Sequence, residues 1–586
     1  MVTFATHQHT DLVENWIEHA RSAFSSDSSP MVDLKIVALD SILFATCEEK
    51  GWACEFRNLE EETQVLLEEM DAHTNHKGGL REDRRSFAAL GFVKINMILD
   101  MVESLPSYAP HTPGGVLVSD ADVVWLDSPF SDAQSKGGGS FFQSSQHAQA
   151  ADVFAACDCL SPTEDAATSE FNTGVVFFRN TRATRSLLIA WANAVWDSAK
   201  ANPDRKVNDQ SHFNMLVKAS EPRMHDSFDM DLAPAGHPGL KTRAHPGDGR
   251  NLFWGLGRTL LVGLLPTHLF PNGHVYFVQK WHAYAPHPLP SAALPDIPWD
   301  SDAPFDTRHA GSPYAVHSSF SYMGYVGKIV RFREANLWAL PPPPPSPKGY
   351  LMYTALPDLD LLATALKEAN SLPQKAIPHA HMQLMRWQGK RIRAALRISA
   401  ATSRTLVLPP LLSTCDRMFY FVSKCRPLAG THMPLPFVPP LDHVIRVNEL
   451  ESRGFDISPV ADVKLDALSA VSAVDSLPPQ ATHRDVASIP GVEVWTRVMG
   501  HVLGRASDLS SSSSSSLSSS SSLPRRLADL VDVEADVLVL DDPAVLEPIL
   551  FPVSDPVFED HMRALSHDWC CFENGTLSYE MSESAT

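Results

Sequence analysis

Two aspartates two residues apart, Asp120 and Asp122, follow an apolar run in the segment VLVSDADVVWLDSPF at residues 116–130. Where a strand ends or turns, this spacing lets both carboxylates address one ligand. Hard dications such as Mn²⁺ and Mg²⁺ take carboxylate oxygens and keep coordination positions open for phosphate oxygens. The pair therefore indicates a metal site that neutralises a diphosphate, although Asp-x-Asp alone is equally compatible with a plain strand-ending turn.

The segments around this pair alternate between strand-like and helix-like patterns. Short apolar runs at 34–39, 115–118 and 174–178 predict buried strands. Residues 86–101 and 181–195 place apolar side chains at helical spacing. Such alternation predicts an α/β sandwich with a largely parallel sheet, in which ligands bind beyond the carboxyl ends of the strands.

Two low-complexity segments divide the chain. A proline run predicts a stiff linker at 341–349, which separates a first domain at 1–340 from the rest. A helical pattern followed by an apolar run then predicts a second, smaller α/β domain at 350–586. The serine-rich stretch at 508–524 has little apolar surface to bury, so we expect a disordered insertion there.

The charge of the chain argues against polyanionic partners. Acidic residues number 69 and basic residues 48, which gives a net charge of -21. Nucleic acid and anionic membrane surfaces are therefore not expected to bind. One nucleotide is still compatible with this charge, because a dication can offset its phosphates locally.

Eight cysteines are present without a CxxC pair, so no zinc site is expected. Cys47 with Cys54, or Cys415 with Cys425, could close short disulfide loops. Buried free thiols are equally compatible with the pattern, and the redox compartment stays open.

Several further segments carry a resemblance to a known family. They read EFNTGVVFFR at 170–179, NDQSHFN at 208–214 and LFPNGHVY at 269–276, followed within 313–338 by PYAVHSSF, GYVGK and RFREANLW. Their order resembles the nucleotide-diphospho-sugar transferases of plants and green algae. More narrowly, it resembles the arabinosyltransferases that glycosylate hydroxyproline-rich, extensin-type proteins. The resemblance covers nearly all of 1–340 and continues beyond the proline run.

The resemblance implies a GT-A, Rossmann-like fold in which Asp120 and Asp122 hold Mn²⁺ (or Mg²⁺) and the donor diphosphate. Asp122 would be a direct metal ligand, and Asp120 would contact the ribose or the metal. His317 would complete the metal shell, and Lys328 in GYVGK would bind a phosphate oxygen. A histidine satisfied at a strand end is the alternative for His317.

The remaining candidates would contact the donor. Asn172 and Gly174 precede a buried strand, where glycine lets the backbone approach the sugar and the amide bonds its hydroxyls. Asp209 and Gln210 precede a helix and would recognise the sugar or position its anomeric carbon as catalytic residues. Turn chemistry and helix capping explain the same residues without a ligand.

Two more donor contacts come from a helix and a strand end. Lys94 interrupts the apolar face of its helix, so it could reach the diphosphate or extend to solvent. Asp40 ends a strand on the expected nucleotide side and could contact uracil or ribose.

By resemblance, the chain is expected to transfer L-arabinofuranose from a UDP-sugar, with retention, to a hydroxyproline-rich glycoprotein glycan in cell-wall biogenesis. Galactosyl or xylosyl transfer on the same fold and a non-catalytic glycan-binding relic are the alternatives. No stretch resembles a transmembrane helix or signal peptide, so the chain as written is expected to be soluble. Members of the family carry a Golgi anchor, and we therefore expect a truncated N-terminus and a Golgi-lumen location.

Overall fold

The computed structural model describes most of the predicted site-bearing segments. The described residues are 1–25, 32–57, 84–108, 114–130, 141–142, 149–160, 170–201, 208–218, 252–256, 259–280, 313–353, 359–371, 379–414, 435–459, 471–474, 537–540, 572–573 and 576–577. The predicted serine-rich insertion and the Cys415–Cys425 pair lie outside them, whereas Cys47 and Cys54 form a disulfide. Among the described helices, none has the length and apolar character that crossing a bilayer requires.

The chain divides into two compact units. The first comprises Met1–Tyr276 and Lys280–Ser319, and the second comprises Phe277–Gln279 and Phe320–Thr586. The elements of the first unit are β1 (Val2–Ala5), η1 (His7–His9), α1 (Thr10–Phe24), β2 (Lys35–Ala38), α2 (Ser41–Lys50), β3 (Cys54–Phe56), α4 (Arg84–Ser104), β4 (Val116–Ser119), β5 (Val123–Trp125), β6 (Val153–Cys157), β7 (Phe171–Phe178), α6 (Arg182–Ala201), α7 (Asp209–Lys218), β8 (Leu252–Gly255), β9 (Leu260–Leu264) and β10 (Ala315–His317). A π-helical turn, η3 (His274–Val278), passes from the first unit into the second.

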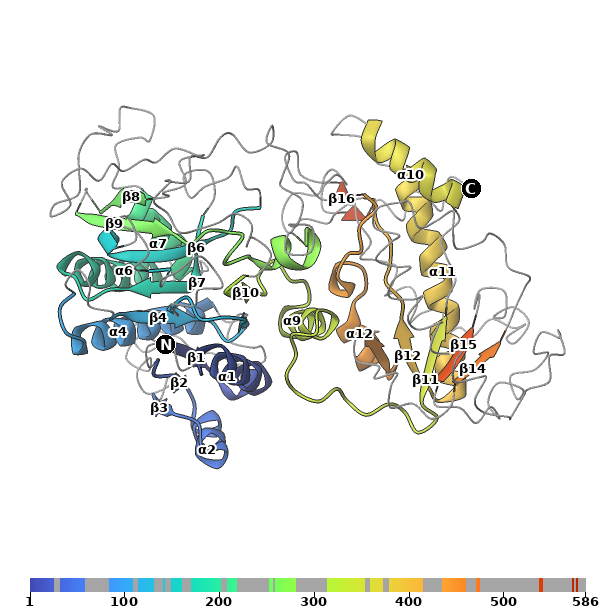
Figure 1. The fold of residues 1–586 in the computed structure, drawn as a ribbon, viewed down its shortest axis with the longest axis horizontal. Helices are drawn as coiled ribbons and strands as arrows, with labels where there is room; N and C mark the ends of the chain where they lie inside the picture. The colour runs from blue at the N-terminus through green and yellow to red at the C-terminus, as the bar shows by residue number, and fades with distance from the viewer. Residues whose placement is uncertain are drawn as a thin grey trace. The chain divides into compact units, whose positions relative to one another are not determined.

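An eight-stranded sheet forms the centre of the first unit, in the order β3-β2-β1-β4-β7-β6-β9-β8 (Figure 1). The pairs β3-β2, β2-β1, β1-β4 and β6-β9 are parallel, while β7 runs antiparallel to both of its neighbours. The edge strand β8 is antiparallel to β9. The predicted α/β sandwich is confirmed, with a sheet that is mixed around β7.

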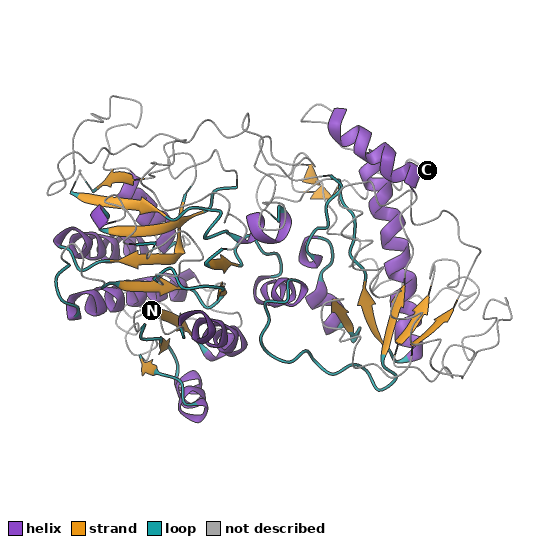
Figure 2. Cartoon of the chain, in the orientation of Figure 1, coloured by secondary structure: helices purple, strands orange, loops and turns teal. Residues whose placement is uncertain are grey.

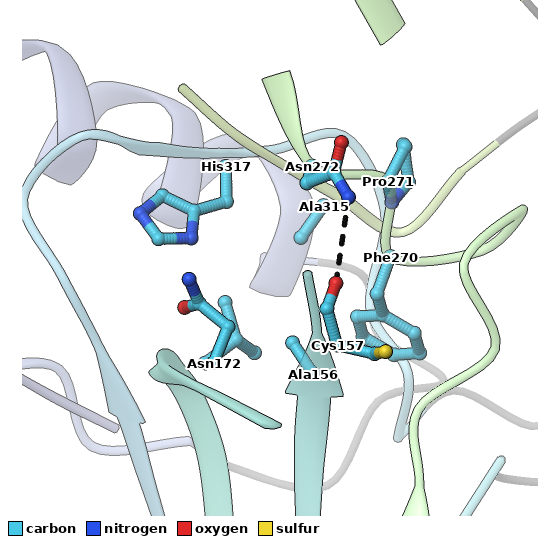
Figure 3. Close-up of a pocket in the computed structure, with 9 residues that line it drawn as sticks. Ala156, Cys157, Asn172, Phe270, Pro271, Asn272, Ala315 and His317 are labelled. Atoms are coloured by element: carbon cyan, nitrogen blue, oxygen red, sulfur yellow. Dashed lines mark hydrogen bonds between the residues drawn. The ribbon is translucent and has the colours of Figure 1, made fainter. Parts of the chain in front are cut away.

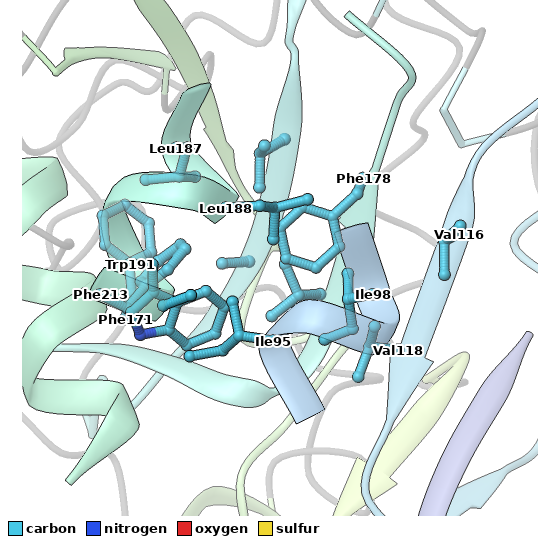
Figure 4. Close-up of a cluster of buried hydrophobic side chains, with 14 of the residues drawn as sticks. Ile95, Ile98, Val116, Val118, Phe171, Phe178, Leu187, Leu188, Trp191 and Phe213 are labelled. Atoms are coloured by element: carbon cyan, nitrogen blue, oxygen red, sulfur yellow. The ribbon is translucent and has the colours of Figure 1, made fainter. Parts of the chain in front are cut away.

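Helices cover both faces of this sheet (Figure 2). Strand side chains alternate between the faces: Val116 and Val118 of β4 pack against α4, α6 and α7, whereas Leu117 packs toward α1. Figure 4 shows the first of these clusters, in which Trp191 and Phe213 are buried beside the sheet. Fully burying a large apolar side chain contributes about 1.5–3 kcal/mol, so this layer holds α6 and α7 firmly in place.

The second unit contains a sheet of five parallel strands in the order β13-β12-β11-β15-β14. Its long helix α11 packs on this sheet through Ile392, Ala395 and Leu396. The elements of this unit are α9 (Gly324–Glu334), β11 (Tyr350–Tyr353), α10 (Leu359–Ser371), α11 (His379–Thr402), β12 (Thr405–Leu408), η5 (Leu441–His443), α12 (Val447–Ser452), β13 (Ile457–Pro459), β14 (Val471–Val474) and β15 (Val537–Leu540). A short hairpin, β16 (Phe572–Glu573) and β17 (Thr576–Leu577), lies near the chain end.

The division between the units lies at Phe320, upstream of the proline run at which we placed the linker. The reason is a buried ion pair within the second unit. Arg331 of α9 donates from Nε to Asp442 Oδ1 at 2.8 Å, and neither side chain is exposed. Glu334, also of α9, accepts a hydrogen bond from the backbone of Leu441. These bonds attach α9 to the η5 turn, so the helix that begins at GYVGK packs with the second unit.

Candidate functional site

Asp120, Asp122 and His317 converge at one edge of the central sheet. One ligand atom from each lies within 4.8 Å of the others, and His317 Nε2 is 3.4 Å from Asp122 Oδ1. Asp122 and His317 are buried, with 6% and 8% of their surfaces exposed. Two carboxylates and an imidazole form a donor set that suits Mn²⁺ and is compatible with Mg²⁺, so the residues fit the predicted metal.

Backbone pairing explains why His317 meets the aspartates from far along the chain. Strand β10 is antiparallel to β5, with His317 opposite Val123. The backbone N–H of Ser318 donates to the carbonyl of Asp122 at 2.9 Å. The turn that carries both aspartates is thereby fixed to the strand that carries the histidine.

The buried hydroxyl of Ser119, the residue before Asp120, supports this turn. Ser119 Oγ accepts hydrogen bonds from the indole N–H groups of Trp16 at 3.0 Å and Trp125 at 3.1 Å. The backbone N–H of Asp120 donates to the carbonyl of Gly174 at 2.7 Å. Because these groups are buried and paired, the position of the Asp-x-Asp backbone is well defined.

Lys94 points from α4 to this cluster. Its ammonium donates to Asp120 Oδ1 at 2.9 Å, and its side chain is only 10% exposed. Burial alone would lower the pKa of Lys94, but Asp120, Asp209 and Asp122 outweigh burial and hold that pKa above its ordinary value. The lysine therefore stays charged and offsets part of the negative charge of the site.

Asn172 and Gln210 also reach this edge of the sheet, from β7 and from the first turn of α7. Their side-chain amides both donate to one carboxylate, that of Asp158, at 2.9 Å each. Gly174 leaves room for the imidazole of His317, because a Cβ added there would lie 2.3 Å from Cε1 of His317. The predicted residues of β7 are thus adjacent to the predicted metal ligands.

Asp209 begins α7, and its position is set from two sides. Its carbonyl accepts the indole N–H of Trp191 at 2.8 Å. Asn214, one turn later, exchanges hydrogen bonds with both backbone groups of Phe171 in β7. These bonds hold the start of α7 against the start of β7, so Asp209 and Gln210 lie at the same edge of the sheet as Asn172.

Asp40 and Lys328 are placed differently from the residues above. Asp40 caps α2 by accepting from Leu43 N at 2.8 Å, and its other oxygen accepts from His7 N at 2.7 Å. Lys328 lies in α9 of the second unit. A contact of Asp40 with the base or ribose and a contact of Lys328 with phosphate stay predictions.

Three features in and beside a small pocket lined by His317 and Asn172 were not predicted from the sequence (Figure 3). Asn272 donates from Nδ2 to the carbonyl oxygen of Cys159 at 2.7 Å. Cys157 and Cys159 form a disulfide, and Asp158 lies between them. Burial raises the pKa of Asp158, while its bonds with Asn172 and Gln210 and the charge of His317 oppose that shift. The signals in the sequence were the CDC tripeptide after an apolar run and, for Asn272, the segment LFPNGHVY.

Comparison with known proteins points to one class. Residues 31–294 match the family described as nucleotide-diphospho-sugar transferase. Arabinosyltransferase XEG113 of Arabidopsis thaliana is 28% identical over 348 residues, which cover 57% of this chain and 42% of the relative. The chain therefore spans less than half of the length of that relative.

Two solved structures show weaker likeness. The galactosyltransferase LgtC, solved with donor and acceptor sugar analogs, has 11% identity and a TM-score of 0.29 over 58% of this chain and 96% of that chain. The apo form of mouse xyloside xylosyltransferase 1 has 13% identity and a TM-score of 0.26 over 54% of this chain and 96% of that chain. At such TM-scores the likeness adds nothing about the site.

The family match contains every predicted site residue except His317 and Lys328. The mixed sheet with helices on both faces agrees with the predicted GT-A, Rossmann-like fold. The predicted resemblance is confirmed: the first unit of this chain resembles the plant nucleotide-diphospho-sugar transferases over the region that carries Asp120 and Asp122.

Proposed function

We propose that the chain is a metal-dependent glycosyltransferase that moves L-arabinofuranose from a UDP-sugar to a hydroxyproline-rich glycoprotein glycan in cell-wall biogenesis. One observation carries the proposal: Asp120 and Asp122, which lie in a region similar to nucleotide-sugar transferases, meet His317 within 4.8 Å. The choice of arabinose and of this acceptor rests on the likeness to XEG113, which is named an arabinosyltransferase.

Asp120, Asp122 and His317 would hold Mn²⁺ (or Mg²⁺) through carboxylate oxygens and an imidazole nitrogen. When bound, the metal would offset the charge that develops on the departing UDP. Lys94, in contact with Asp120, adds a fixed positive charge on the same side of the site. Electrostatic groups held in place before the reaction stabilise a leaving group without reorganisation.

The sugar would lie against Asn172 and Gln210, whose amide N–H groups suit hydroxyl oxygens. Asp209, at the start of α7, would position the anomeric carbon. Retention of configuration is part of the proposal and rests on the family resemblance. A location in the Golgi lumen rests on the same resemblance, and the disulfides Cys47–Cys54 and Cys157–Cys159 support an oxidising compartment.

The test is UDP release from a panel of UDP-sugars, with and without Mn²⁺, in the wild type and in Asp122→Ala. A matched control is Asp11→Ala, an exposed carboxylate in the first turn of α1. We expect one sugar to be turned over only with Mn²⁺, by the wild type and Asp11→Ala but not by Asp122→Ala.

The panel also separates the alternatives. Turnover of UDP-galactose or UDP-xylose in place of the arabinose donor would keep the enzyme class and change the sugar. Binding of UDP with Mn²⁺ but no turnover of any sugar, in folded wild-type protein, would refute the transferase and favour a glycan-binding protein.

A further inference from the structure

We propose that Asp158 is a positioning residue that orients the amides of Asn172 and Gln210 toward the bound sugar. The inference rests on the proposed function, because it assigns a role within the same donor site. It adds to that function a carboxylate that the Asp-x-Asp motif and the metal triad do not include.

Both ends of each amide are hydrogen-bonded. Asp158 Oδ1 accepts from Asn172 Nδ2, and Asp158 Oδ2 accepts from Gln210 Nε2, both at 2.9 Å. The amide oxygens are occupied as well: Gly174 N donates to Asn172 Oδ1 at 2.8 Å, and Thr173 N donates to Gln210 Oε1 at 3.4 Å.

These bonds leave one orientation for each amide. An ionised carboxylate only accepts hydrogen bonds, and a backbone N–H only donates. If either amide turned over, an oxygen would face the carboxylate and a nitrogen would face an N–H. Each amide nitrogen has a second hydrogen beyond the one that Asp158 accepts, and this hydrogen is the donor offered to a sugar hydroxyl.

The backbone of Asp158 is itself held on both sides. Its backbone N–H donates to the carbonyl of Glu170 at 2.9 Å. The flanking residues Cys157 and Cys159 are bridged by a disulfide. Asn272 Nδ2 donates to the carbonyl oxygens of Cys159 at 2.7 Å and Cys157 at 3.4 Å. A carboxylate on so constrained a backbone presents its oxygens in a fixed direction.

Holding an ionised Asp158 in this position costs stability. Burial penalises the ionised form and raises the pKa of Asp158, and the two amides and His317 oppose that effect. Among the described residues, the side chains bonded to this half-buried carboxylate are the neutral amides of Asn172 and Gln210, whereas acids removed from water are usually paired with a cation. A group that costs stability is expected where function needs it.

The test compares Asp158→Asn with Asp152→Asn. Asp152 comes directly before β6, whereas Asp158 comes directly after it. The carboxylate of Asp152 accepts a hydrogen bond from Leu261 N at 2.8 Å, and an asparagine oxygen can accept the same bond. Two quantities are measured with Mn²⁺ present: the Kd of UDP, which lacks the sugar, and kcat/KM for the UDP-sugar that the wild type uses.

We expect Asp158→Asn to leave the Kd of UDP within about twofold, because the metal triad and Lys94 are untouched. Its kcat/KM should fall by about 10- to 100-fold, since misplacement by about 1 Å costs that much. Asp152→Asn should leave both quantities unchanged. A purely structural role would weaken UDP binding and turnover together, and that result would overturn the proposal.

A second variant covers the case in which Asp158→Asn does not fold. Cys157→Ala/Cys159→Ala removes the bridge and keeps the carboxylate, and Cys47→Ala/Cys54→Ala is its matched control. We expect reduced kcat/KM with unchanged UDP affinity in the first pair only.

The outcomes also separate this inference from the proposed function. Wild-type turnover in Asp158→Asn, alongside loss of turnover in Asp122→Ala, would overturn the inference alone. Absence of sugar turnover in the wild type would overturn the proposed function and this inference with it.

Discussion

The substitution Gly174→Ala tests whether His317 belongs to a metal site. A Cβ at this position would lie 2.3 Å from His317 Cε1 and 2.9 Å from His317 Nδ1. Carbon atoms in contact are normally about 3.5–4.0 Å apart, so the ring must withdraw by more than about 1 Å. His317 Nε2 would then leave its place 3.4 Å from Asp122 Oδ1.

The expected result is a Kd for Mn²⁺ that rises by about 10- to 100-fold, the range seen when the support of a ligand is removed. This change corresponds to about 1.4–2.8 kcal/mol. Isothermal titration with Mn²⁺, in the absence of nucleotide, measures it directly. Gly114→Ala is the matched control, because a Cβ at Gly114 has no neighbour within 4 Å among the residues that the structure describes.

A double variant sharpens the test. If Gly174→Ala acts only by displacing the imidazole, then Gly174→Ala/His317→Ala should bind Mn²⁺ no more weakly than His317→Ala alone. Unchanged Mn²⁺ affinity in folded Gly174→Ala would refute the assignment of His317 as a ligand. Additive losses in the double variant would show that the glycine acts by another route.

Three further changes have defined outcomes. Lys94→Met removes a charged hydrogen bond to Asp120 and should cost the metal-free protein about 1–3 kcal/mol, with a smaller fall in Tm when Mn²⁺ is present. Burial lowers the pKa of His381 from 6.5 to about 3, so only the unfolded chain gains this proton as the pH falls below 6.5. Stability is then lost at about 1.4 kcal/mol per pH unit, and His381→Gln should recover about 2 kcal/mol at pH 5 in urea unfolding. Asp442→Ala leaves Arg331 buried without its acid and should cost about 3–5 kcal/mol, with faster hydrogen exchange in α9.

Each of these three predictions has a result that would contradict it. An equal fall in Tm with and without Mn²⁺ would separate Lys94 from the metal site. The same loss of stability between pH 7.5 and pH 5 in His381→Gln and the wild type would exclude this histidine as the cause. Unchanged exchange in α9 of Asp442→Ala would show that the ion pair does not attach the helix.

The cluster of Asp120, Asp122 and His317 was predictable because each member lies in a segment with a recognisable pattern. Asp120 and Asp122 end an apolar run at a spacing suited to one ligand, and His317 lies in a segment that resembles a known family. The alternating patterns likewise predict the strands β2, β4 and β7 and the helices α4 and α6. Local patterns suffice for these features because a strand and the turn after it are contiguous in the chain.

The boundary between the units was not predictable from such patterns. A proline run marks a stiff segment, but it does not say with which unit the preceding helix packs. That choice depends on Arg331 reaching Asp442, which is 111 residues away in the chain. A buried pair at this separation has no local signature, and it places α9 with the second unit.

The direction of β7 explains how motifs from opposite ends of strands form one site. In a wholly parallel sheet, Asn172 at the start of a strand would lie at the edge opposite to Asp120, which follows the end of β4. Because β7 is antiparallel to β4, Val175 pairs with Ser119 and the start of β7 meets the end of β4. Strand β6 is antiparallel to β7 in turn, with Cys157 opposite Phe171. Asp158, the next residue after β6, therefore reaches the same edge, and this position follows from strand direction and not from any pattern around Asp158.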